Sequence, residues 1–209
     1  MNLEALKAAV SEFVAEIDDL YGYFMDSTIG FAHNLRLMQE REVEQVRLMG
    51  SQERVDAVLY SYLDKSPMDP DHRVLHQTTQ ANFKARNSKR GANYRRSVHI
   101  LIVFIYEYWE TEYRGRIATN IDIPRNDLKL PLMGDLRLLR HDIIHHQGVL
   151  RPATIEKLEV INGFTKGAGK LNFQEDQIEA LLRGVKGMLD KIVVDAGGGD
   201  PGHRTVWHF

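Results

Sequence analysis

The chain has 209 residues, of which 43% are hydrophobic and 27% charged, and its formal net charge is −2. This length and composition are typical of one globular domain with a sizeable core. The small net charge excludes a protein that binds nucleic acid through its overall charge, so any such binding needs a local patch. The absence of cysteine excludes disulfides, cysteine nucleophiles and cysteine metal ligands, and it fits a reducing environment.

The sequence shows no sign of a targeting or membrane segment. The N-terminal sequence MNLEALKAAV has an early acidic residue and lacks the long apolar run of a signal peptide. The longest apolar run, residues 98–106, is interrupted by His99 and is far shorter than the roughly 20 residues that span a bilayer. We therefore predict a cytoplasmic protein that does not enter a membrane.

The first third of the chain is predicted to be largely helical. Apolar residues recur at intervals of three and four through residues 3–25, and a helical period continues through residues 29–49. After a break at residues 49–51, residues 52–63 form another amphipathic segment. Residues 64–71, DKSPMDPD, have the composition of a loop.

The rest of the chain contains three further predicted helices. Residues 72–93 fit either a helix or a loop, whereas residues 94–118 show a strong helical pattern. Four segments follow in chain order: a linker over 119–133, a helix within 136–149, an irregular glycine-bearing stretch over 150–173 with a turn or short hairpin, and a last helix over 174–194. No run of alternating strands is evident, so we predict an all-α antiparallel helical bundle with irregular loops. It forms one domain over residues 1–195, and a flexible, glycine-led tail occupies residues 196–209.

The helix within residues 136–149 has recognisable ends. Asp135 is its predicted N-cap, and Gly148 is its predicted stop. Apolar residues recur at spacings of four, three and four along one side: Leu132, Leu136, Leu139 and Ile143. The polar residues of this helix are therefore expected on the flanks of a buried face.

These polar residues are concentrated in the sequence RHDIIHH, residues 140–146. Arg140 and His145 form an R-x4-H arrangement. Cleavage of RNA without a metal needs a general base, a general acid and a cation for the charged phosphorane. Histidine suits the proton transfers near neutral pH, and the permanently charged, planar arginine suits the phosphate.

The R-x4-H arrangement resembles the signature of the HEPN superfamily, small all-α domains that include many metal-independent endoribonucleases. His141 directly follows the arginine, a glycine follows the histidines, and an aromatic and charged helix precedes the motif. The resemblance covers residues 94–193 well and the N-terminal third only loosely. It implies a bundle of HEPN type and a homodimer in which two arginines and two histidines surround one phosphate.

The resemblance also implies residue roles. Arg140 would hold the phosphate, and His145 would act as base or acid. His141 would orient this pair, and His146 is a possible substitute for His145. The implied activity is metal-independent cleavage of RNA to 2′,3′-cyclic phosphate ends, with no metal or cofactor. The biological setting is implied by the family resemblance alone. The protein would be the toxin of a toxin–antitoxin or phage-defence system, with an antitoxin protein as a possible partner.

Three residues are predicted to support the motif. Asp142 lies four positions before His146 and is placed to fix the tautomer of that histidine. Glu110 and Arg114 are spaced as an i,i+4 pair on the preceding helix. A surface ion pair is the favoured interpretation, and a supporting acid with a phosphate contact facing the motif is the alternative.

One stretch is strongly basic. Residues 82–97, here called the basic stretch, contain six cations, no acid, and the aromatic residues Phe83 and Tyr94. Its predicted RNA-binding residues are Lys84, Arg86, Lys89, Arg90, Arg95 and Arg96. Basic and aromatic side chains together suit single-stranded RNA, because charge follows the backbone and rings stack on bases. A solvated loop is an equally good interpretation.

Two other functions compete with the nuclease. His141-Asp142 is the dipeptide of metal-dependent HD phosphohydrolases, which also need an upstream histidine, here His99, and a downstream aspartate, Asp176 or Asp190. The flanking sequences do not match that class. The other alternative is a non-catalytic dimeric helical module that binds RNA or a protein.

Overall fold

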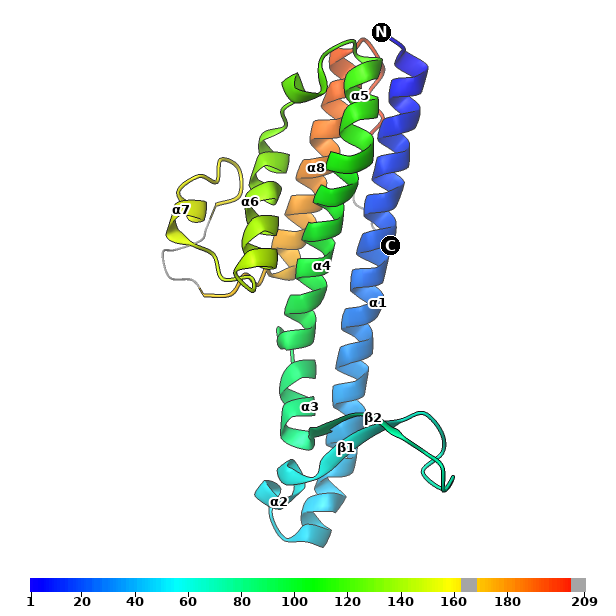
Figure 1. Cartoon of the computed structure of the whole chain (residues 1–209), viewed down its shortest axis with the longest axis vertical. Helices are drawn as coiled ribbons and strands as arrows, with labels where there is room; N and C mark the ends of the chain where they lie inside the picture. The colour runs from blue at the N-terminus through cyan, green and yellow to red at the C-terminus, as the bar shows by residue number, and fades with distance from the viewer. Residues whose placement is uncertain (163–168, 204–209) are drawn as a thin grey trace. The chain divides into compact units, whose positions relative to one another are not determined.

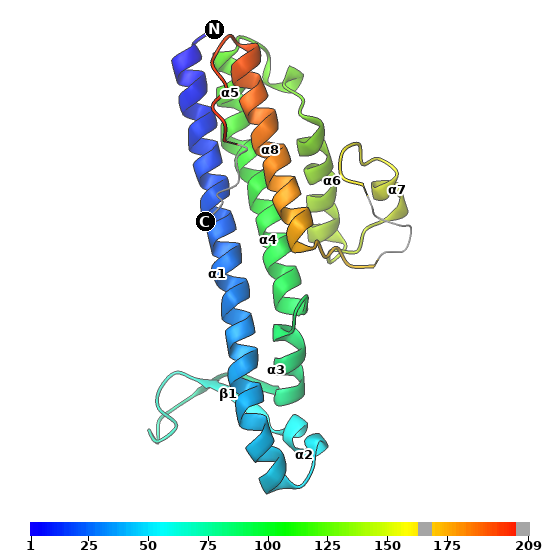
Figure 2. The same ribbon diagram turned by 180° about the vertical axis from the view of Figure 1, so that it is seen from behind.

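The computed structural model describes residues 1–162 and 169–203 (Figures 1 and 2). These residues are mostly helical with one two-stranded sheet, which confirms the mainly α class, while the HEPN type stays a prediction. The contacts group into two compact units. The first consists of Met1–Phe24 together with Val98–Phe209, and the second of Met25–Ser97. Among the described residues, none of the helices combines the length and the hydrophobicity needed to cross a bilayer.

The first unit is an antiparallel helical bundle. The beginning of α1 (Leu3–Met49) and the elements after residue 97 build it. In chain order these elements are α4 (Ala92–Tyr108), the π-helical turn η1 (Trp109–Tyr113), α5 (Arg114–Asn120), the 3-10 turn η2 (Arg125–Asp127), α6 (Pro131–His145), α7 (Pro152–Ile155) and α8 (Glu175–Asp195). Figures 1 and 2 show α1, α4–α5, α6 and α8 side by side, with α7 beyond α6.

The core of this bundle is where the helical periodicity predicts it. Phe13 of α1 stacks on Tyr113, with ring centroids 4.7 Å apart, and on Trp109 at 6.0 Å. The predicted apolar faces of α4 and α8 are buried almost throughout. One difference concerns the helix predicted over residues 94–118. In the structure this helix begins earlier, at Ala92, and it contains the π-helical turn η1.

The predicted N-cap of the motif helix is wrong. The helix α6 begins one turn earlier, at Pro131, so Asp135 lies inside it. The carboxylate of Asp135 is only 1% exposed. It accepts hydrogen bonds from the backbone N–H groups of Glu159 at 2.9 Å, Val160 at 2.8 Å and Ile161 at 2.7 Å. This residue therefore anchors a later segment to α6 and does not cap the helix.

The second unit contains the remainder of α1 and a hairpin. In chain order its other elements are α2 (Gln52–Ala57), β1 (Leu59–Leu63), β2 (Val74–Thr79) and α3 (Gln80–Asn87). Residues 3–25 and 29–49, two successive segments by sequence, form the single helix α1. Residues 52–63 were predicted as one amphipathic segment, but only six of them are helical and the last five pair with β2 as an antiparallel strand. The predicted loop over residues 64–71 connects these strands.

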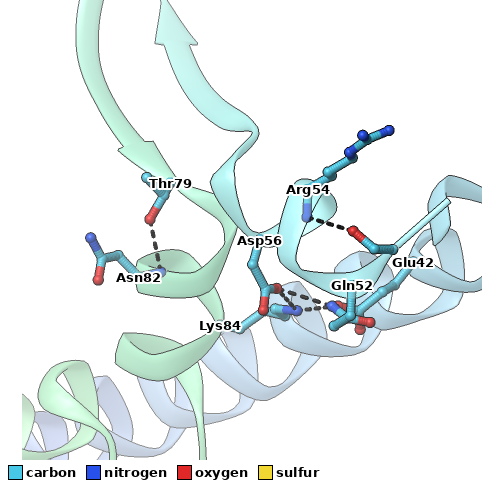
Figure 3. A network of polar contacts seen from close by, with 8 residues as sticks. Glu42, Gln52, Arg54, Asp56, Thr79, Asn82 and Lys84 are labelled. Carbon is cyan, nitrogen blue, oxygen red and sulfur yellow. Dashed lines mark hydrogen bonds and ion pairs between the residues drawn. The ribbon is translucent and has the colours of Figure 1, made fainter. Parts of the chain in front are cut away.

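Side-chain hydrogen bonds tie the short elements of the second unit together (Figure 3). Ser51 caps α2 by accepting from the N–H of Arg54, and Thr79 caps α3 in the same way. Lys84 of α3 binds Asp56 of α2 at 2.6 Å and also pairs with Glu42 of α1. This lysine therefore links three helices of the unit.

Candidate functional site

The motif helix α6 ends in a tight left-handed turn. Gln147 and Gly148 both have positive φ, 55° and 77°. The carbonyl of Asp142 accepts from the N–H of His146 and from the N–H of Gly148, both at 3.0 Å, which closes the end of the helix. A Cβ at Gly148 would lie 2.3 Å from Cε1 of His99 on α4. Glycine is thus required by both the backbone and the neighbouring ring, and the predicted stop is confirmed.

Asp142 is buried under this turn and holds the segment that follows it. Its side chain is fully buried, and it accepts from the backbone N of Arg151 at 3.0 Å and from the Nε of Arg151 at 2.7 Å. Burial favours the neutral acid, but hydrogen bonds from the Arg151 backbone, the Thr154 side chain and the Arg151 guanidinium outweigh it and lower the pKa of Asp142. Asp142 is therefore an anion bound to Arg151. Its predicted effect on the tautomer of His146 stays a prediction.

Three histidines gather at the C-terminal end of α6. The ring of His141 lies 4.7 Å from that of His145 and 5.7 Å from that of His146, measured between centroids. His141 and His145 are exposed, and His146 is half-buried. Desolvation, together with the charges of Arg151 and His145, lowers the pKa of His141, so its ring is neutral at neutral pH and able to accept a proton.

Arg140 lies on the opposite flank of the helix, against α4. Its guanidinium bonds to Glu107 at 3.0 Å and lies 5.9 Å from the ring centroid of Tyr106. Its side chain is 32% exposed, and its Nε is buried without a hydrogen-bond partner in the part of the chain that the structure describes. Within one chain, therefore, Arg140 contacts α4 while His141 lies next to both other histidines, as their separation from Arg140 around the helix axis implies.

Two neighbours of the site were missed by sequence reasoning, namely Glu107 and Arg151. Neither shares a helix with the residue it binds. Glu107 reaches Arg140 from α4, and Arg151 reaches Asp142 from beyond the left-handed turn. The only signal in the sequence is charge, an acid in the aromatic helix and a cation three positions after the glycine stop. Charge alone does not identify a partner.

Glu110 and Arg114 form the predicted i,i+4 ion pair, with Nη1 and Oε2 3.0 Å apart. The pair has further partners. Arg125 of η2 binds Glu110 at 2.8 Å, and Arg114 donates to the carbonyl of Leu128 at 3.1 Å. These contacts fasten the connection between α5 and α6. They favour a structural role over the alternative of a phosphate contact at the motif.

Two of the six cations of the basic stretch, Lys84 and Arg86, are held against other side chains of the unit. Lys84 is neutralised by two carboxylates, as described above. Arg86 packs over the rings of Phe83 and Tyr62 and bonds to His76 at 2.9 Å. Of the other four cations, Lys89, Arg90 and Arg96 are exposed, and Arg95 is half-buried, as are Lys84 and Arg86. These four are the better candidates for contact with RNA.

Two of the residues required by an HD phosphohydrolase, Asp190 and His99, have partners of their own, whereas the alternative aspartate, Asp176, is exposed. Asp190 is fully buried and is bound by Nδ1 of His203 at 2.7 Å, and Nε2 of that histidine lies 3.4 Å from Oγ of Ser11. His99 bonds through Nε2 to the carbonyl of Leu171 at 2.9 Å. These contacts do not favour that class of enzyme.

The candidate site is therefore the histidine cluster, defined as His141, His145 and His146, with Arg140 on the other flank of the same helix. Its groups can transfer protons and bind an anion. No family model, no curated protein and no solved structure matches the chain.

Proposed function

We propose that the chain is a metal-independent endoribonuclease that acts as a homodimer. The observation that carries this proposal is the histidine cluster at the C-terminal end of α6, where the ring of His141 lies close to those of His145 and His146, with a permanent cation on the opposite flank of the helix. One histidine removes the proton of the 2′-hydroxyl, and another protonates the 5′ leaving oxygen. His145 is the first candidate, and His141 and His146 complete the cluster.

The second copy of the chain supplies what one copy lacks. In one chain Arg140 is held toward α4 by Glu107, and the nearby Arg151 is bound to the buried carboxylate of Asp142, so a phosphate over the histidines needs another cation. A two-fold axis beside α6 would bring the partner's arginine to that phosphate, because an isologous contact repeats each interaction. Ile144 lies between the histidines in sequence and is 47% exposed, and this apolar side chain suits such a contact.

The biological setting is a further proposal that rests only on the HEPN resemblance. A nuclease of this kind would act as the toxin of a toxin–antitoxin or phage-defence system, and an antitoxin protein would be its natural partner. The four exposed or half-buried cations of the basic stretch would hold the RNA.

RNA cleavage should proceed in EDTA and leave 2′,3′-cyclic phosphate ends. The reason is that the 2′-hydroxyl of RNA is the nucleophile and needs only deprotonation by a histidine. The measurement is an incubation of the purified protein with RNA and with DNA of the same sequence, followed by analysis of the product ends. A preparation of His145→Ala, purified identically, controls for contaminating nucleases. Loss of activity in chelator, or cleavage of the DNA, would contradict the mechanism. RNA binding without cleavage would favour the non-catalytic module.

The simultaneous change of Lys89, Arg95 and Arg96 to glutamine should weaken RNA binding and make the binding constant less dependent on salt concentration. Each lost phosphate contact lowers the slope of log K against log salt by about 0.7 for a single strand, so the slope should fall by about 2. Fluorescence anisotropy with labelled RNA at several salt concentrations measures this slope. A triple variant of the exposed cations Lys7, Arg47 and Lys191 is the matched control. Equal slopes for the two variants would show that the basic stretch is only a solvated surface.

A further inference from the structure

We propose that His141, Asp142 and His146 form a binding site for a divalent transition-metal ion. This site shares His141 and His146 with the proposed nuclease site, so a bound ion would occupy histidines needed for proton transfer and inhibit cleavage, but binding of the ion does not depend on that activity. The three residues meet where α6 ends, because the half-buried His146 lies four positions after Asp142 and its N–H still donates to the carbonyl of Asp142 at 3.0 Å, which keeps both residues on one side of the helix.

The spacing of the potential ligand atoms carries the proposal. One nitrogen from each imidazole and one carboxylate oxygen all lie within 4.8 Å of one another. Around a tetrahedral zinc ion with bonds of about 2.0–2.1 Å, ligand atoms are separated by about 3.3 Å. The remaining gap is small, and rotation of the exposed His141 side chain and of His146 can close it. The buried carboxylate of Asp142 stays in place.

The donor set indicates which ions fit. Two imidazole nitrogens and one carboxylate oxygen suit zinc, nickel, copper or cobalt, whereas magnesium and calcium prefer oxygen ligands throughout. Three protein ligands leave a fourth position for water. His145 is close enough to approach that position, because its ring centroid is 4.7 Å from that of His141.

Arg151 has two opposite effects on metal binding at this site. Its backbone N–H, 3.0 Å from Oδ2 of Asp142, orients the carboxylate, as an outer hydrogen bond commonly does for a metal ligand. Its guanidinium bonds to Oδ1 at 2.7 Å and brings a positive charge to the place where a cation would bind. The side chain is 43% exposed, so it can move away when the ion enters.

Titration of the full chain with Co²⁺, followed by the visible absorption of the bound ion and by displacement with Zn²⁺, tests the proposal. We expect His141→Gln and His146→Gln each to weaken binding by at least about tenfold. His33→Gln, which removes an exposed histidine from α1, should leave the affinity unchanged. Arg151→Gln should strengthen binding, because it removes the opposing charge and keeps the backbone donor.

Several results would overturn the proposal. Failure of the unaltered chain to bind Co²⁺ or Zn²⁺ would do so directly. Loss of binding in His145→Gln with full binding in His146→Gln would assign the ion to a simple i,i+4 histidine pair on the helix. An unchanged affinity in Arg151→Gln would remove Asp142 from the ligand set. Circular dichroism of each variant confirms that the helices are retained. Because the readout is metal binding and uses no RNA, it is independent of the nuclease proposal.

Discussion

His145→Ala should lower the rate of RNA cleavage by about 10²–10⁴-fold, the usual contribution of a general acid or base. The exposed position of His145 near the end of α6 means that the fold should be unaffected. Single-turnover cleavage of a defined RNA measures the effect. His33→Ala, an equally exposed histidine on α1, should cleave at the normal rate. Full activity of His145→Ala would contradict the assignment and direct attention to His146.

Arg140→Ala should be similarly inactive, and the two variants together test the dimer. In a mixed dimer, one copy keeps its histidine and the other keeps its arginine. If both copies contribute to one site, mixing the two inactive proteins should restore part of the activity. Activity that stays absent after subunit exchange has been verified would show that each copy works alone. The arginine would then have to leave Glu107 and reach the histidines of its own chain.

Asp135→Ala should lower the free energy of unfolding by about 3 kcal/mol, because a buried carboxylate with charge-assisted hydrogen bonds is lost. Three consecutive backbone N–H groups, Glu159 to Ile161, lose their acceptor at once. Urea denaturation of the full chain measures the change. Asp127→Ala, which removes an exposed aspartate from η2, should change stability by no more than about 0.5 kcal/mol. A decrease in the free energy of unfolding of less than about 1 kcal/mol would mean that water replaces the carboxylate as the acceptor for these N–H groups.

Asp135 also shows the limit of reading helix ends from the sequence. An aspartate just before a run of apolar residues is a good N-cap by local pattern. Its real partners lie 24–26 positions further along the chain, and local spacing says nothing about them. The apolar positions were easier, because Leu132, Leu136 and Leu139 face the core wherever the helix begins.

The hairpin was missed for a related reason. Residues 52–63 have an amphipathic pattern, and Ser51 is a true N-cap. The helix nevertheless stops after six residues, because residues 59–63 find their hydrogen bonds in β2, across an intervening loop. Strand formation depends on such non-local pairing more than on the intrinsic preference of five residues. The ambiguous residues 72–93 contain both the partner strand and α3.

The candidate site was predictable to the extent that it lies on one helix. His141 and His145 are one turn apart, so their proximity follows from helical geometry. The inclusion of His146, four positions after Asp142, also follows from helical spacing, because its N–H donates to the carbonyl of Asp142 at 3.0 Å. The contacts of Arg140 with Glu107 and of Asp142 with Arg151 depend on how separate segments pack, which the sequence does not display.

The π-helical turn η1 has a consequence for comparing this chain with others. A π turn holds one more residue than an α turn, so every later side chain is rotated by about 100° around the helix axis. The extra residue is thus equivalent to a one-residue insertion that the helix accommodates without forming a loop. An alignment with a relative whose helix is regular should place its gap within residues 109–113, in the middle of a buried helix.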